Sequence, residues 1–224
     1  MRTLSSLVHA LMCFASIGFF QADNTQSTRP AASAQREEQE QEKEAPPKPV
    51  AVENGKAELN ATNTTIRFVG THVGAKPDPR TGYFSKFTGE LEVHETAQAP
   101  QAVSLVIDTS SLVTPIGRLT GHLHSPDFFD VRRYPKATFE STKIEPVDRE
   151  RGRYKITGDL TIRDVTKPIS LPATVKVTDE GLVLASKFKI KRTDFGINFG
   201  PDRVVDEVAL AVTVGKPTPK VEPQ

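Results

Sequence analysis

Apolar and polar residues alternate in short runs along residues 58–215, and turn-forming residues separate the runs. In residues 156–162, for example, every second residue is apolar or glycine, and the residues between them are polar or charged. Because successive side chains of a β-strand point to opposite faces of the sheet, this period places one apolar face toward an interior. Such runs predict about eight antiparallel strands, the others being residues 66–70, 91–93, 103–107, 175–177, 182–184, 188–190 and 208–214.

An antiparallel sheet of this size protects its edges by closing into a barrel or by folding into a sandwich. The alternation by itself does not choose between these two architectures. Two segments between the runs, residues 110–120 and 125–134, favour short helical turns. We expect the second to begin at Ser125, with Pro126 at its first helical position.

Residues 1–22 have the pattern of an export signal peptide. Arg2 provides the positive start, and the apolar run at residues 4–20 is too short and too polar for a typical membrane span. Cleavage near Ala22 would release the mature chain, whereas an uncleaved signal would anchor it to the membrane. The sequence therefore predicts a periplasmic or secreted protein, with membrane anchoring as the alternative.

Cys13 is the only cysteine of the chain and lies inside this apolar run. The preceding Met12 is not the small residue that a lipoprotein signal needs, so an ordinary apolar role is favoured over lipidation. Removal of the signal leaves a chain without thiols, which suits an oxidising compartment.

Polar segments flank the predicted folded domain on both sides. Residues 23–57 are rich in Glu, Gln and Pro, and residues 216–224 are also polar, so both are expected to be disordered. The first would act as a flexible spacer between the membrane and a domain at residues 58–215. The formal net charge is +1, far from the basic composition of a protein that binds nucleic acid.

The most distinctive segment is residues 121–142. A Ser-Pro-Asp turn precedes Phe128 and Phe129, a Tyr-Pro pair interrupts the chain again, and a strand-like Ala-Thr-Phe-Glu-Ser-Thr follows. Bulky apolar side chains are thus concentrated in an irregular segment between strands. Such a segment either packs into an interior or closes over it.

With its flanking sequence, this segment resembles the YceI-like family of exported, lipocalin-like barrels that hold a polyisoprenoid chain. The family's order of motifs continues at residues 66–74, 82–91, 106–112, 156–169 and 191–196. The resemblance implies an antiparallel eight-stranded lipocalin-like barrel, a size at which the interior holds either packed side chains or one slender ligand. The chain departs from the family in having no Trp and in carrying Thr120-Gly121 where an Arg-Asp pair is usual.

An interior rich in Phe, Leu, Ile and Val suits a long apolar ligand, because burial supplies on the order of 25 cal/mol per Å² of apolar area. The resemblance implies a polyisoprenoid, an isoprenoid quinone or a related lipid, which is carried or stored and not chemically changed. By strand phase, we expect the interior to be lined by Phe68, Phe84, Phe87, Leu91, Val93, Leu105, Ile107, Leu123, Phe139, Leu160, Ile162, Phe188 and Ile190. Phe128 and Phe129 are expected to form a flap, and His72 and Arg192 to hold a polar head.

Three alternatives remain open from the sequence. The interior could be a solid core, or the chain could be a structural module of the cell envelope. A secreted metal-dependent hydrolase or metal-binding protein could use His72, His122 and His124, although their spacing matches no common metal motif. The chain has no nucleophile elbow and no phosphate-binding glycine loop, so we predict no enzyme and no cofactor.

Lys187, Lys189 and Lys191 alternate with apolar residues and are expected to point outward from one strand. Outward lysines commonly protect a sheet edge, and they would also suit contact with an anionic membrane surface. The sequence leaves open whether the chain forms a homodimer and which lipid it binds.

Overall fold

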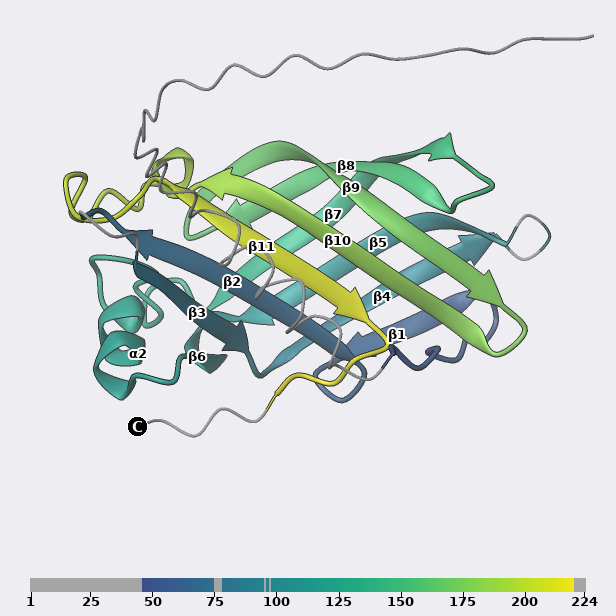
Figure 1. Cartoon of the computed structure of the whole chain (residues 1–224), viewed down its shortest axis with the longest axis horizontal. Coiled ribbons are helices and arrows are strands. Elements are labelled where there is room, and N and C mark those ends of the chain that lie inside the picture. Colours follow the sequence, from purple (N-terminus) through teal and green to yellow (C-terminus); the bar gives the residue numbers. More distant parts are fainter. Residues whose placement is uncertain (1–45, 75–77, 95, 97, 220–224) are drawn as a thin grey trace, which may run out of the picture. The chain divides into compact units, whose positions relative to one another are not determined.

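One curled antiparallel sheet of eleven strands forms the part of the chain that the structure describes (Figure 1). The structure is a computed structural model and describes residues 46–74, 78–94, 96 and 98–219. The strands are β1 (Lys56–Asn60), β2 (Thr64–His72), β3 (Asp78–Phe84), β4 (Phe87–His94), β5 (Ala99–Asp108), β6 (Leu112–Val113), β7 (Lys136–Asp148), β8 (Arg153–Ile162), β9 (Val165–Thr178), β10 (Gly181–Lys191) and β11 (Glu207–Val214). The predicted export signal and residues 23–45 of the predicted spacer lie outside the described residues.

The strands follow the order β1-β4-β5-β7-β8-β9-β10-β11-β2-β3-β6, so β1 and β6 are the two ends of the hydrogen-bonded sheet. The all-β prediction is confirmed, but the predicted count of eight strands is wrong. β1 begins in the last two residues of the predicted spacer and matches no predicted run, and β6 has two residues. β3 contains Pro79 and Gly82, which are residue types depleted in strands. The separate runs predicted at residues 182–184 and 188–190 belong to one strand, β10.

Gly82 is needed in β3 because β2 and β3 pack closely at this position. A Cβ atom on Gly82 would lie 2.2 Å from Cζ of Phe68, its register partner on β2, and 3.0 Å from the carbonyl oxygen of Val113. Glycine inside a strand often marks such a close approach. Gly82, which weakens the strand signal in the sequence, therefore makes room for the ring of Phe68.

The predicted alternation is realised as burial along the strands. In β8, Ile156, Leu160 and Ile162 are buried, whereas Lys155 and Asp159 are exposed. The buried side chains of all strands meet in one hydrophobic core. The alternation of apolar and polar residues therefore predicts which side chains face the interior, even though the predicted number of strands is wrong.

The first described residues pack against the ends of β10 and β11. The backbone N–H of Lys48 donates to the carbonyl of Gly215 at 2.8 Å, and Val50 pairs with Leu182 at the start of β10. Val50 also packs against the hydrophobic core. The segment before β1 is therefore part of the folded unit, although it lies within the predicted spacer.

A tight turn at Asn54-Gly55 connects this segment to β1. Both residues have positive φ, and Glu53 and Lys56 exchange two backbone hydrogen bonds across the turn. Asn-Gly is the preferred pair for such a two-residue hairpin. Within residues 23–57, this local signal is the one that indicates folded structure just before β1.

The chain after β11 is also held in place. The backbone N–H of Thr218 donates to the carbonyl of Ala61, and its Oγ1 donates to the carbonyl of Thr64, both at 2.8 Å. Of the predicted disordered tail at residues 216–224, residues 216–219 are therefore described and at least Thr218 is hydrogen-bonded.

The described residues contain one α-helix, α2 (Gly117–His124), and two short 3₁₀ helices, η1 (Thr109–Ser111) and η2 (Arg192–Phe195). The helical turn predicted to begin at Ser125 is wrong. Ser125 ends α2 instead, where its Oγ donates to the carbonyl of His122 at 2.7 Å, and turns follow. None of the helices in the described ranges is long and apolar enough to cross a membrane.

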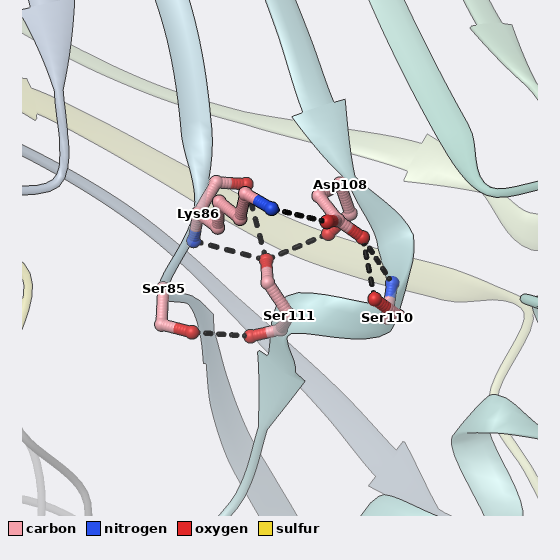
Figure 2. Close-up of polar contacts among 5 residues, drawn as sticks. All are labelled: Ser85, Lys86, Asp108, Ser110 and Ser111. Carbon is pink, nitrogen blue, oxygen red and sulfur yellow. Dashed lines mark hydrogen bonds and ion pairs between the residues drawn. The ribbon is translucent and has the colours of Figure 1, made fainter.

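Polar contacts join the corner between β3 and β4 to the corner between β5 and β6 (Figure 2). Oγ of Ser111 accepts from the backbone N–H of Lys86 at 3.0 Å, and Oγ of Ser85 donates to the carbonyl of Ser111 at 2.9 Å. Oδ1 of Asp108 accepts from the N–H and Oγ of Ser110, at 3.0 and 2.6 Å. These bonds fasten the region where the ladder ends at β6.

Acid should weaken the contacts around Asp108. Hydrogen bonds from Ser110 hold the pKa of Asp108 below its ordinary value, burial opposes the shift, and Lys86 at 3.4 Å adds to it. Because the folded-state pKa is lowered, the carboxylate stabilises the fold above the unfolded pKa of about 4 and loses this effect as pH falls through the folded pKa. In urea titrations we expect Asp108→Asn to cost up to about 1 kcal/mol at neutral pH and progressively less as pH falls below about 4. A difference that is independent of pH would contradict this assignment.

Candidate ligand-binding cavity

A cavity lies inside the curled sheet, toward the end that carries α2 and the last residues of β2 and β10 (Figure 1). The volume of the cavity is about 190 Å³. Strands β2, β5 and β7 to β11 form most of its wall, and side chains of α2 and of the segments that follow α2 and β10 cover it. The cavity is partly open to solvent.

Most of the residues predicted to contact a ligand line this cavity. They are Phe68, His72, Phe84, Leu105, Ile107, Leu123, Phe128, Phe129, Phe139, Leu160, Ile162, Phe188, Ile190 and Arg192. Phe87, Leu91 and Val93 are buried but do not line it. They belong to β4, which pairs with β1 in a part of the interior that side chains fill.

Strand β11 contributes lining residues that were not predicted from the sequence. Val208, Leu210 and Val212 all line the cavity, and their alternation is plain in the sequence. Ile197 and Val204 also line it, but they lie in an irregular loop after η2. The apolar/polar alternation could have identified the β11 residues from the sequence. The two loop residues, Ile197 and Val204, have no periodic signal.

The predicted flap residues contact both sides of the cavity's covered end. The ring of Phe129 meets that of Phe84 edge to face at 6.1 Å. The ring of Phe128 lies 5.0 Å from His122 of α2 and 5.3 Å from Phe199, which belongs to the loop after η2. Two separate segments of the chain thus meet over the cavity through aromatic contacts.

Few polar side chains reach the cavity. Oγ of Ser186 is already bonded to the carbonyl of Pro172 at 2.6 Å. His72, which is exposed, and Arg80, which is paired with Asp78, lie at the adjoining ends of β2 and β3. Arg80 was not predicted as a site residue, because the strand that carries it was not recognised. The polar part of the lining is therefore concentrated at these two strand ends.

Arg192 is buried at the edge of the cavity, with 4% of its surface exposed. Its Nη1 donates to the carbonyl of Ile197 at 2.7 Å, Nη2 to that of Val204 at 3.0 Å, and Nε to that of Val205 at 3.4 Å. No carboxylate among the described residues forms an ion pair with it. The guanidinium therefore serves mainly to fix the loop that covers the cavity.

The three histidines of the metal alternative do not form a metal site. Nε2 of His122 lies 2.9 Å from Oδ2 of Asp127, and Nε2 of His124 lies 2.9 Å from the carbonyl of Leu112. No group of three or more His, Cys, Asp or Glu residues in the described ranges could hold a metal ion. His72 lies at the end of β2, where it pairs with Val204.

Solved structures share this fold. BcnA of Burkholderia cenocepacia aligns with a TM-score of 0.61 and 25% identity, over 67% of this chain and 94% of that protein. A polyisoprenoid binding domain from Saccharophagus degradans, implicated in plant cell wall breakdown, aligns with a TM-score of 0.56 and 19% identity. That alignment covers 71% of this chain and 96% of the domain, and at this identity it shows the fold alone.

Sequence comparison agrees with the structural one. The UPF0312 protein VPA0850 of Vibrio parahaemolyticus is 36% identical over 116 residues, which are 52% of this chain and 59% of that protein. The chain thus spans little more than half the length of this relative. Residues 58–215 match the family model of the YceI-like domain. The chain therefore belongs to the YceI-like domain family, as the resemblance in its sequence predicts.

Proposed function

We propose that the protein binds a long apolar lipid, a polyisoprenoid or an isoprenoid quinone, in this cavity and carries or stores it without chemical change. The observation that carries the proposal is a hollow interior whose wall is almost entirely apolar. Each CH₂ group that leaves water for such a wall contributes roughly 0.8 kcal/mol. The fold shared with a polyisoprenoid binding domain supports this class of ligand.

The lipid tail would lie between the inner faces of β5, β7 and β8 on one side and β10 and β11 on the other. Half-buried side chains such as Phe188, Ile190 and Leu210 face this space, so a tail would remove their remaining apolar surface from water. The rings of Phe128 and Phe129 would cover the tail. An apolar wall of this kind fixes no reacting atom, which favours binding over catalysis.

A polar head would lie near His72 and Arg80. These two side chains provide hydrogen-bond donors at the polar ends of β2 and β3, where a head group would also remain in contact with water. Arg192 is less suited to this role than the sequence suggested, because three of its nitrogen atoms already bond loop carbonyls.

We place this function in the cell envelope, in the periplasm or outside the cell. The support is the export-signal pattern of residues 1–22 and the absence of cysteine after Cys13. An apolar lipid in water needs a carrier or a store between membranes, and this protein would be such a carrier or store.

Native mass spectrometry with isoprenoid quinones of increasing tail length would test the proposal. The affinity should rise by at least about tenfold for each added isoprene unit until the cavity is filled, because each unit buries several CH₂ groups. A quinone ring without a tail is the matched control and should not bind. Equal affinity for all tail lengths would contradict the proposal.

A further inference from the structure

Basic side chains surround Tyr134 at the start of β7. The guanidinium carbons of Arg133 and Arg163 lie 5.1 and 5.2 Å from the centre of the Tyr134 ring. Arg132 and Lys136, which are exposed, flank the same residue in the chain. We call Arg132, Arg133, Lys136 and Arg163 the basic corner.

The sheet register explains why these residues come together. β7 and β8 pair Thr138 with Thr161, and the same antiparallel register extended by two residues places Lys136 opposite Arg163. Nη1 of Arg163 is bound to the carbonyl of Gly196 at 3.0 Å, which ties the turn between β8 and β9 to the loop after η2. The basic corner therefore joins two parts of the fold that meet at the covered end of the cavity.

The positive charge of the basic corner is not neutralised by ion pairs. None of its four side chains lies within ion-pair distance of a carboxylate in the described part of the chain. Asp164 accepts from the Tyr134 hydroxyl at 3.1 Å. Asp130 is close in sequence, and Asp108 is the register partner of Lys136 on β5 but forms its ion pair with Lys86 at 3.4 Å. These carboxylates leave the four cations with a net positive charge.

The wall of the cavity lies directly behind these residues. Ala137 follows Lys136, Ile162 precedes Arg163, and both line the cavity. Because neighbouring residues of a strand point to opposite faces, Lys136 is outside where Ala137 is inside, and Arg132 and Arg133 are also exposed. Arg163, in the turn after β8, is half-buried. The charge therefore marks the outer surface of the ligand site itself.

Two exposed apolar side chains lie at the same end of the sheet. Val73, which is 54% exposed, follows β2, and Ile116, which is 39% exposed, precedes α2. Figure 1 shows α2 and the tip of β2 at this end. Charged and apolar groups together are typical of surfaces that contact the interface of a bilayer.

We propose that the basic corner docks the protein on an anionic bilayer surface, with the covered end of the cavity toward the lipid. Guanidinium groups match phosphodiester oxygens with paired hydrogen bonds, and Val73 and Ile116 can enter the apolar boundary. The biological purpose of docking rests on the proposed function, because a bound apolar lipid would pass between cavity and bilayer without crossing water. The docking itself depends only on these surface groups.

The test compares the full-length protein and two triple variants on vesicles. The first variant carries Arg132→Gln, Arg133→Gln and Lys136→Gln, which are all exposed and leave the contacts of Arg163 in place. The matched control carries Arg149→Gln, Arg153→Gln and Lys155→Gln, which are exposed at the opposite end of β7 and β8. Binding to phosphatidylglycerol vesicles is measured and divided by binding to phosphatidylcholine vesicles. Because the apolar N-terminal run contributes to both, its contribution largely cancels in this ratio.

The wild-type ratio should be high and should fall in concentrated salt. The first variant should lower it on the order of 100-fold, about fivefold for each charge removed, and the control should keep it. An equal loss in both variants, no loss in the first, or displacement by inorganic phosphate at matched ionic strength would overturn the proposal. The first variant should still bind isoprenoid quinone in solution, so a failure of docking and a failure of lipid binding are separate results.

Discussion

Ala137→Phe is expected to abolish lipid binding and to leave the protein folded. Ala137 lies on the inner face of β7, lines the cavity and is 4% exposed. A phenyl ring added there would project into the cavity and take space from the tail. Displacement of three or more CH₂ groups of the ligand should weaken binding by at least about 50-fold. Native mass spectrometry with a long-tailed quinone measures this loss.

The same substitution distinguishes a hollow interior from a solid core. In a packed core an added ring costs about 1–3 kcal/mol through overpacking, whereas in a cavity it gains contacts and costs little. Ala211→Phe is the matched control, because Ala211 lies on β11 between Lys187 and Arg67 and does not line the cavity. Destabilisation of Ala137→Phe by about 1–3 kcal/mol relative to Ala211→Phe, together with a wild type that binds no quinone, would contradict the hollow interior.

Arg192→Leu should destabilise the fold by about 2–4 kcal/mol, a large part of the stability of a typical domain. The substitution removes three donors and leaves the carbonyls of Ile197, Val204 and Val205 without their partner. Arg192→Lys keeps the charge but cannot reach three carbonyls at once, so its effect should be intermediate. The free energy of unfolding from urea titration measures both effects.

Arg203→Leu is the control for loss of an arginine in the same loop. Arg203 is exposed, so its replacement should change the free energy of unfolding by less than about 0.5 kcal/mol. If Arg192→Leu were as mild as Arg203→Leu, Arg192 would not hold the loop. A role in binding a head group would then regain support.

The period of two in the sequence predicts the sheet and its interior, because inward and outward side chains must alternate whenever one face is buried. The alternation fails for β3. Gly82 is required there for close packing against Phe68, and Pro79 lies near the start of the strand, so neither position shows the alternation of apolar and polar residues. It also fails at the start of the fold, where a polar composition conceals the segment that pairs Val50 with Leu182. Within residues 23–57, only the Asn54-Gly55 hairpin signal indicates folded structure.

The cavity itself could be predicted only in part. Strand phase identifies inward residues such as Phe188, but it cannot tell whether an inward residue lines a space or fills it. Leu91 illustrates this limit, because it is inward and fully buried in the filled part of the interior. The role of Arg192 depends on a loop whose carbonyls have no sequence signature, so its three bonds could not be foreseen.

Mass spectrometry of the organic extract from protein purified out of its native host tests the central proposal most directly. We expect one dominant co-purified lipid with the mass of a polyisoprenoid or an isoprenoid quinone, in about equimolar amount, that is absent from an Ala137→Phe preparation. An extract without lipid, from a protein that also fails to bind added isoprenoids, would contradict it.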